Sequence, residues 1–244
     1  MPNVKHIVTV FRIHLARLRA EAGPFLLAAL VFPTAMYLFA NAIRGGVTED
    51  QNRLRFLAGS IVFSLSLTAI SWLGYLLLEN RFTGRLKLFA TLPLAASSYV
   101  FGILIFGIAQ AILGIGALML VARLLGARTQ LGVLPLAATI LLTMLCLCGI
   151  SVIIATRARS FSEGSLVTDS LGAGLVFLAP VYYSAEAMPH GLRIVSEWLP
   201  TAVAAHAVQQ ALGGSFAMRD LAGLGLMALV TLSVGFKLMR FREN

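Results

Sequence analysis

The chain has 244 residues, of which 59% are hydrophobic and only 12% are charged, and its mean hydropathy is +0.89. Soluble domains carry roughly 25% charged residues, so this composition indicates a membrane protein and excludes a water-soluble catalytic domain or a fused ATPase. The formal charge of +9 is typical of a membrane protein with basic cytoplasmic loops, and we expect no binding of nucleic acid.

The first predicted element is an amphipathic helix within residues 1–22. Its apolar residues recur at helical spacing, and its basic residues fall on the opposite side. The apolar set is Val4, Ile7, Val8, Phe11, Leu15 and Leu18. This pattern predicts a helix lying in the cytoplasmic membrane interface with its basic face toward anionic headgroups. The alternative is a basic tail that only fixes the topology.

Six segments are apolar enough to cross the hydrocarbon core, which takes about 20 helical residues. They are residues 25–43, 56–78, 99–122, 131–156, 166–183 and 221–239. The first is long enough to remain in the bilayer, so we expect no cleavable signal peptide. A weaker segment, residues 201–212, contains His206, Gln209 and Gln210, which favours a re-entrant or interfacial helix over a seventh span.

Six spans place both termini on one side of the membrane. That side would hold 12 of the 19 Lys and Arg residues, and the other side would hold 7. Basic residues concentrate in cytoplasmic loops, so the count predicts an inner-membrane protein with both termini in the cytoplasm.

Motifs of ATPases and membrane enzymes are missing from the sequence. Its three lysines follow Val4, Leu86 and Phe236, so a phosphate-binding loop ending in Gly-Lys cannot be present. The four histidines form no HExxH motif, and no serine lies in a GxSxG elbow. Cys146 and Cys148, two positions apart, can neither pair nor chelate one metal. We therefore predict a chain that is not an enzyme and has no cofactor of its own.

The loop between the second and third predicted spans, residues 79–93, reads ENRFTGRLKLFATLP. As a short helix ending before the proline, it would place Phe82, Leu86 and Phe89 on one face and Arg81 and Arg85 on another. This segment resembles the coupling helix of ABC-2 type exporter permeases, which has an acidic residue, a Gly-Thr-Leu-like core and a Leu-x-x-Thr-Pro end.

The resemblance implies that this helix sits in a groove of a partner ATPase. The implied contact residues are Arg81, Phe82, Thr83, Gly84, Arg85, Leu86, Phe89 and Pro93. A helix resting on lipid headgroups is the alternative.

A second match lies near the C-terminus, where FLAPVYY (residues 177–183) precedes MPHGLRIVSEWLP (residues 188–200). It is similar to the stretch of the same family in which an extracellular re-entrant pair, here residues 184–214, leads into the last span. The resemblance therefore covers residues 1–244 as a single transmembrane domain. It implies pairing with a second permease chain, identical or homologous, and with two copies of an ATPase that holds ATP and Mg²⁺.

Asp169 is the clearest ionisable residue inside a predicted span. Ser160 and Glu163 form a capping box, so the fifth helix should start at Phe161 and place Asp169 roughly 12 Å further along its axis. A carboxylate at that depth costs several kcal/mol unless it faces protein or water. It could line the translocation cavity or a dimer seam, or it could be hydrogen-bonded to a neighbouring Ser or Thr.

Small and polar residues recur inside the spans. Ser60, Ser64 and Ser71 form a stripe that could line a substrate pathway with Asp169, or that could bond back to its own helix. Close helix packing would explain a set of glycines. They are Gly102, Gly107, Gly114, Gly116, Gly172 and Gly174.

The function that follows is the permease subunit of an ABC-2 type exporter. It would move a lipid, drug, peptide or lipid-linked glycan across the cytoplasmic membrane. The alternative is an ATPase-independent secondary or facilitative carrier, which the scarcity of ionisable residues in the spans disfavours.

Overall fold

The structure is a computed structural model that describes residues 4–20, 23, 27–43, 50–85, 96–183 and 188–238. All regular elements in these residues are helices, and none is a strand. The predicted all-α fold class is therefore confirmed.

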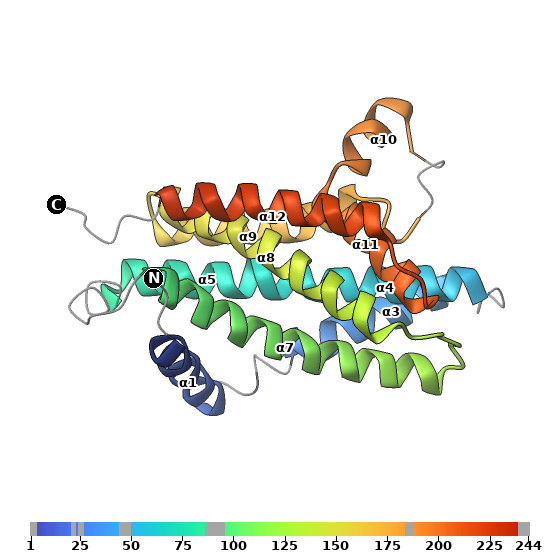
Figure 1. Cartoon of the computed structure of the whole chain (residues 1–244), viewed down its shortest axis with the longest axis horizontal. Coiled ribbons are helices and arrows are strands. Elements are labelled where there is room, and N and C mark those ends of the chain that lie inside the picture. Colours follow the sequence, from blue (N-terminus) through green and yellow to red (C-terminus); the bar gives the residue numbers. More distant parts are fainter. Residues whose placement is uncertain are drawn as a thin grey trace.

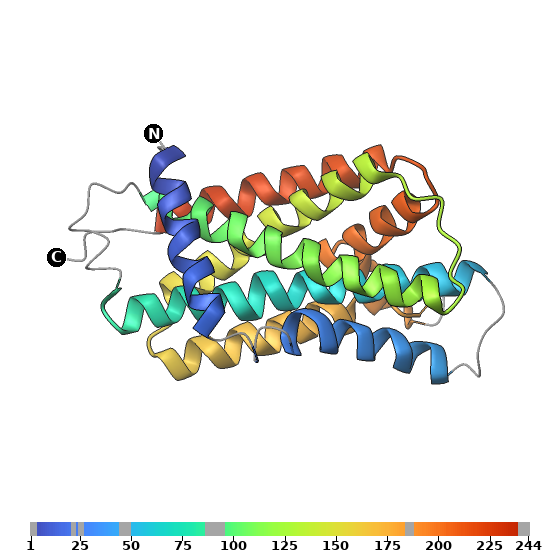
Figure 2. The same cartoon turned by 90° about the horizontal axis from the view of Figure 1, so that it is seen from below.

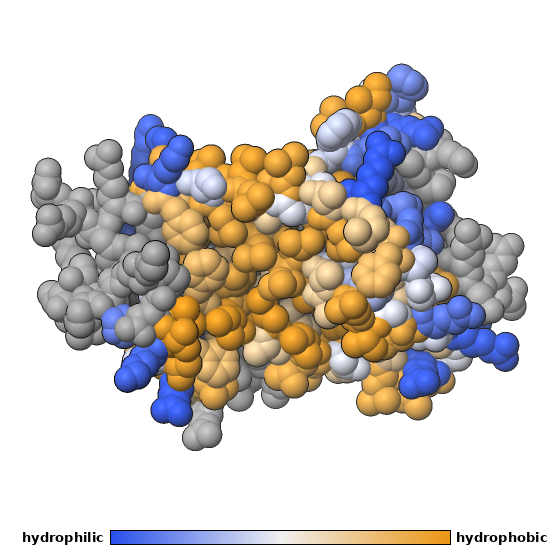
Figure 3. All heavy atoms as spheres, viewed as in Figure 1, coloured by the Kyte–Doolittle hydropathy of each residue, from blue (hydrophilic) through white to orange (hydrophobic). Residues whose placement is uncertain are grey.

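Four continuous helices are long and apolar enough to cross a membrane, and they lie along the long axis of the molecule (Figure 1). The longest consists of α4 (Asp50–Ser66), the π-helical segment η2 (Leu67–Trp72) and α5 (Leu73–Phe82). The others are α7 (Ala96–Leu124), α8 (Val133–Arg157) and α12 (Met218–Leu238). Apolar side chains cover the middle of the face in Figure 3, and hydrophilic ones gather toward both ends. This distribution fits a multi-pass membrane protein.

The other two predicted spans correspond to shorter or more polar helices. The π-helical η1 (Leu27–Val31) and α3 (Phe32–Ile43) occupy the first, and α9 (Phe161–Leu178) occupies the fifth and carries both Glu163 and Asp169. Both run roughly parallel to the long helices (Figure 2). Four spans follow from the described helices themselves, whereas the count of six stays a prediction.

The helix from α4 to α5 lies at the centre of the bundle. Of its most apolar window, 78% is buried inside the protein, compared with 17% for α12. It contacts α7, α8, α9 and α11. α12, by contrast, packs against α8 and α11 and leaves one side for lipid or another protein to cover.

Glycines make several of the close helix contacts. A Cβ added at Gly102 would lie 2.6 Å from Val10 Cβ, and one at Gly149 would lie 2.5 Å from Thr231 Oγ1. Of the six glycines predicted to permit close packing, Gly102, Gly107, Gly114 and Gly172 do so. Gly116 and Gly174 do not, because an added Cβ would meet nothing within 4 Å at either position.

The N-terminal helix α1 (Val4–Ala20) lies across one end of the bundle and packs against α7 (Figure 2). Its buried face contains Val10, which is fully buried, and His14, which is 5% exposed. The His14 ring lies 5.9 Å from that of Phe106. Neither Val10 nor His14 belongs to the predicted apolar face, whose members Val4 and Val8 stay exposed. Phe11 of the predicted apolar face does pack against α7, with 6.3 Å between its ring centroid and that of Phe106. The face that contacts protein therefore overlaps the predicted apolar face only in part.

The predicted re-entrant segment contains two helices, α10 (His190–Glu197) and α11 (Pro200–Leu212). α11 packs against α4, α8 and α12, and eight of its 13 residues are buried. It spans about 20 Å at 1.5 Å per residue, which is shorter than the roughly 30 Å hydrocarbon core. α10 projects beyond the bundle (Figure 1). These dimensions suit a re-entrant element.

Candidate functional site

The predicted coupling segment begins at the end of α5. The sequence prediction ended the span at Leu78 and began a separate helix with the next residue. In the structure α5 continues to Phe82, and a turn follows at Thr83 and Gly84. Gly84 has a φ of 76°, which glycine adopts far more readily than other residues. The helical stretch that contains Glu79 therefore ends at Phe82, and the coupling helix over residues 79–93 stays a prediction because residues 86–93 lie outside the described residues.

The remaining predicted contact residues of this segment, Leu86, Phe89 and Pro93, lie outside the described residues. Phe82 ends α5, and its side chain is 40% exposed. Beside it, the Thr83 hydroxyl donates to the Glu79 carbonyl at 2.7 Å. The structure thus places the first part of the segment at the tip of a central helix.

At this tip, the Arg81 side chain forms hydrogen bonds with the neighbouring helix α8. Its Nη1 donates to the carbonyl oxygens of Ala155 at 2.6 Å and Ala158 at 2.9 Å. These carbonyls belong to the last turn and the C-cap of α8, where backbone acceptors lack helical partners and a cation complements the helix dipole. The guanidinium also lies 5.2 Å from the ring centroid of Phe82. Arg81 thus makes internal contacts with α8, which the sequence analysis did not predict, and its contact with an ATPase stays a prediction.

Two further contacts fix the end of α5. Asn80 Nδ2 donates to Tyr99 Oη of α7 at 2.7 Å, and both residues are buried. Arg85 Nη1 forms a 3.3 Å salt bridge with Glu79, in which the Arg85 side chain is 50% exposed. Phe82, Thr83 and Arg85 are therefore the exposed described members of the predicted set, which a partner protein can reach.

The connection between α8 and α9 lies at the same end (Figure 1). Ser160 caps α9, with Ser160 Oγ accepting from the Glu163 amide at 3.1 Å, and Glu163 Oε2 accepts from the Arg159 amide at 3.0 Å. The helix begins at Phe161, the predicted residue. The Phe161 ring packs edge-on against Tyr75 of α5, with 5.0 Å between centroids. We call this end of the bundle, where α5, α8 and α9 meet, the Arg81 end.

Replacing Ser160 with alanine tests this cap. We expect Ser160→Ala to destabilise the protein by about 1 kcal/mol, because the Glu163 amide loses its acceptor. Thermal unfolding of the purified protein in detergent measures the effect. Ser162→Ala is the matched control, since Ser162 is exposed in the first turn of the same helix. Equal losses in the two variants would contradict the capping role.

Two of the predicted substrate-pathway residues, Ser64 and Ser71, lie against neighbouring helices. Ser64 is 1% exposed, and its hydroxyl is buried without a hydrogen-bond partner among the described residues. Ser71 lies against α9, where a Cβ added at Gly172 would come 2.7 Å from Ser71 Oγ. The serine stripe is therefore mostly packed between helices.

Two hydrogen bonds between helices lie at the π-helical segment η2 and just before it. Ser66 Oγ donates to the Gly172 carbonyl of α9 at 2.9 Å. Ser151 Oγ of α8 donates to the Ala69 carbonyl at 2.5 Å. A π-helical turn alters the regular backbone pattern, and here the neighbouring α8 supplies a donor to one of its carbonyls. Neither bond runs back along its own helix.

Asp169 lies on the exposed side of α9. Leu166 on that side is 68% exposed and Phe177 is 53% exposed, and the Asp169 side chain is exposed as well. Within the described part of the chain, no hydrogen bond or ion pair reaches its carboxylate. The alternative of a bond to a neighbouring Ser or Thr therefore gains no support, and a second protein surface or water must solvate this group if α9 lies in the bilayer.

The opposite end of the bundle holds a polar cavity that the sequence prediction missed. It has a volume of about 530 Å³ and is lined by α4, α10, α11 and α12. His206 Nδ1 lies 2.5 Å from Asp220 Oδ2, and Arg193 forms a 2.9 Å salt bridge with Glu197. The sequence did show that α11 carries polar residues such as His206. It did not show that His206 would meet Asp220 of α12, which lies 14 residues further along the chain. Among the described residues, no group of three or more His, Cys, Asp or Glu side chains could hold a metal ion.

The apolar bundle defines a multi-pass membrane protein, and a comparison with protein families shows which kind. Residues 7–212 match the ABC-2 type transporter family. The chain belongs to this family, which confirms the resemblance drawn from the sequence. It is a membrane component of an ABC-type transporter, and such components are not themselves catalytic. No curated protein matches the chain.

Proposed function

We propose that this chain is the permease subunit of an ATP-driven exporter in the inner membrane, with both termini in the cytoplasm. The family match over residues 7–212 is the observation that carries the proposal. In this arrangement η1 with α3 and α9 complete a set of six spans, and the Arg81 end faces the cytoplasm. The cargo belongs to the lipids, drugs, peptides or lipid-linked glycans.

A separate ATPase binds at the Arg81 end in this proposal, and two copies of it hold ATP and Mg²⁺. Phe82 offers an exposed aromatic ring and Arg85 a half-exposed cation, a combination suited to an apolar anchor with a charged rim. Arg81, which is only partly buried, contributes to the coupling through its internal contacts as well. It joins the tip of α5 to the end of α8, so a displacement of α5 moves the connection to α9 as well.

A second permease chain, identical or homologous, covers the exposed side of α9. Supporting this is Asp169, an exposed carboxylate on the same helix as the exposed Leu166 and Phe177. Lipid is a poor solvent for a carboxylate, whereas a protein seam or a hydrated pathway can solvate it. Asp169 marks the side of the chain on which the pathway forms, and Ser64 and Ser71 remain the predicted pathway residues inside the bundle.

The test uses the membrane-inserted chain coexpressed with a candidate ABC ATPase that carries a Walker-A motif. We expect Phe82→Ala, alone and combined with Phe89→Ala, to reduce ATPase copurification or to uncouple ATP hydrolysis from transport. Membrane insertion should be unchanged. Phe216→Ala is the matched control, because its side chain is 50% exposed in the loop before α12.

Unchanged copurification and ATP-dependent transport in both Phe82 variants would rule out this contact. Transport in vesicles that contain the chain alone, without any ATPase, would favour the carrier alternative instead.

A further inference from the structure

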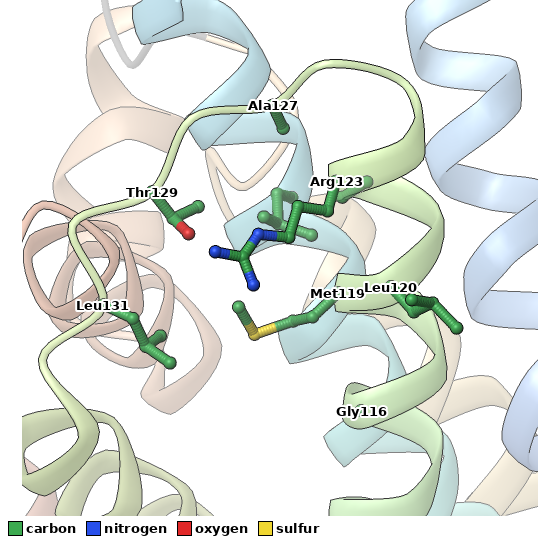
Figure 4. Close-up of a pocket in the computed structure, with 9 residues that line it drawn as sticks. Gly116, Met119, Leu120, Arg123, Ala127, Thr129 and Leu131 are labelled. Atoms are coloured by element: carbon green, nitrogen blue, oxygen red, sulfur yellow. The ribbon is translucent and has the colours of Figure 1, made fainter.

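A smaller cavity, of about 310 Å³, lies between α7, the start of the apolar part of α4 and the loop 125–132 that joins α7 to α8 (Figure 4). It is at the end of the bundle opposite the Arg81 end. Its walls are apolar, with Leu57, Met119 and Leu131 among them, and its two polar side chains are Arg123 and Thr129.

Arg123 gives this cavity its charge. It is in the last turn of α7, and its guanidinium points into the cavity, on the side where Thr129 lies (Figure 4). No hydrogen bond or ion pair to Arg123 occurs within the described ranges of the chain, and its side chain is exposed. The cavity therefore offers the guanidinium group of Arg123 and the nearby hydroxyl of Thr129, two groups that bind a phosphate well.

The mouth of the cavity lies on a surface that lipid would cover. Leu120 is 62% exposed and Leu131 is 42% exposed, and both line the cavity. α7 is one of the four helices that can cross a membrane, and Arg123 is near its end. A cation at that depth lies at the interface, while the apolar part of the cavity extends toward the bilayer centre.

Gly116 keeps the apolar part of the cavity open. It is seven residues before Arg123 on α7, about 10 Å along the helix axis. A Cβ added there would meet nothing within 4 Å, whereas one added at Gly114 would come 2.4 Å from the Ala29 carbonyl. Gly116 is thus not required for helix packing, and its missing side chain leaves room for a ligand.

We propose that this cavity binds one glycerophospholipid from the adjacent leaflet. The phosphodiester accepts hydrogen bonds from Arg123 and the Thr129 hydroxyl, and one acyl chain lies over Gly116 and Met119. This ligand satisfies the free cation and fills the apolar groove at once. The inference is independent of the transport function, since it rests only on α7, α4 and the loop between α7 and α8.

Native mass spectrometry of the delipidated full chain, titrated with dioleoylphosphatidylglycerol, tests the site. We expect Arg123→Gln to weaken binding of one lipid about tenfold or more, as the loss of a charge-assisted hydrogen bond implies. Arg128→Gln should bind like the wild type, because Arg128 is exposed in the same loop and does not line the cavity.

A second pair of variants tests the groove. Gly116→Leu should block the acyl chain without disturbing the fold, whereas Gly225→Leu, on α12, should leave binding unchanged because its Cβ also meets open space. Dioleoylglycerol and glycerol 3-phosphate, which each lack one half of the ligand, should both bind much more weakly than the phospholipid.

Three results would overturn the proposal. Wild-type affinity in both Arg123→Gln and Gly116→Leu would show that lipid binds elsewhere. Equal affinity for dioleoylglycerol would indicate an apolar groove that does not recognise phosphate. Equal affinity for glycerol 3-phosphate would indicate a site for soluble anions.

Discussion

Replacing Gly149 with leucine is expected to destabilise the bundle by about 3 kcal/mol, the upper part of the range for overpacked cores. A Cβ at this position would lie 2.8 Å from the Leu232 amide nitrogen and 2.5 Å from Thr231 Oγ1. The nitrogen belongs to the backbone of α12 and cannot rotate away. Thr231 Oγ1 also donates to the Cys146 carbonyl at 3.1 Å, so the larger side chain would disturb an interhelical hydrogen bond as well.

Differential scanning fluorimetry of the purified protein would show this loss as a fall in Tm of roughly 6 to 12 °C. Gly174→Leu, in α9, is the matched control, because an added Cβ meets nothing within 4 Å there. The close contact between α8 and α12 would be disproved by a Gly149→Leu protein that melts at the wild-type temperature.

Replacing Arg81 with glutamine is expected to abolish most ATP-dependent transport and to destabilise the protein by about 2 kcal/mol. The stability loss follows because two carbonyls, of Ala155 and Ala158, lose a charged donor, and such hydrogen bonds contribute about 1.5–3 kcal/mol. The transport loss follows from the proposed role of Arg81 in joining α5 to α8. Transport into vesicles and the Tm of the same preparation measure the two effects.

Arg85→Gln provides the control for Arg81→Gln. Its salt bridge with Glu79 is half exposed, and exposed ion pairs contribute about 0–1 kcal/mol. Its Tm should therefore stay near that of the wild type. If Arg81→Gln transports at the wild-type rate, Arg81 is only a structural cap of α8.

The all-α membrane class and the family could be predicted from the sequence because both depend on local signals. Apolar blocks of bilayer length mark the long helices, and short motifs carry the resemblance. The packing face of α1 could be predicted only in part, since Phe11 contacts Phe106 but the buried Val10 and His14 were not in the predicted apolar set. Helical periodicity separates apolar from polar residues, but it does not separate residues that face lipid from residues that face protein. Val10 is buried because it meets Gly102 on α7, a contact between distant parts of the chain.

The candidate site was predictable in part for the same reason. Thr83 and Gly84 are turn-forming residues, and the glycine was a sequence signal for the turn that follows α5. The contacts of Arg81 could not be predicted, since its partners Ala155 and Ala158 lie 74 and 77 residues further along the chain. The family resemblance implied a contact with a partner ATPase and gave no sign of these internal backbone partners.

The serine stripe shows a third limit of sequence patterns. Assigning Ser60, Ser64 and Ser71 to one face assumes an unbroken 3.6-residue period. The π-helical segment η2 (Leu67–Trp72) lies between α4 and α5 and shifts the faces that follow it. Ser71, inside η2, is therefore displaced from the face that holds Ser64.

Because of η2, the orientation of α5 depends on the number of residues in this central helix as well as on their identity. A π-helical turn can be regarded as an α-helical turn with one residue inserted, and one residue corresponds to about 100° of rotation. Deleting a single residue between Leu67 and Trp72 would restore a regular helix but would rotate all of α5 about its axis. Arg81 would then point away from α8, although every side chain needed for the contact would still be present. The exact number of residues before Arg81 thus sets its partner.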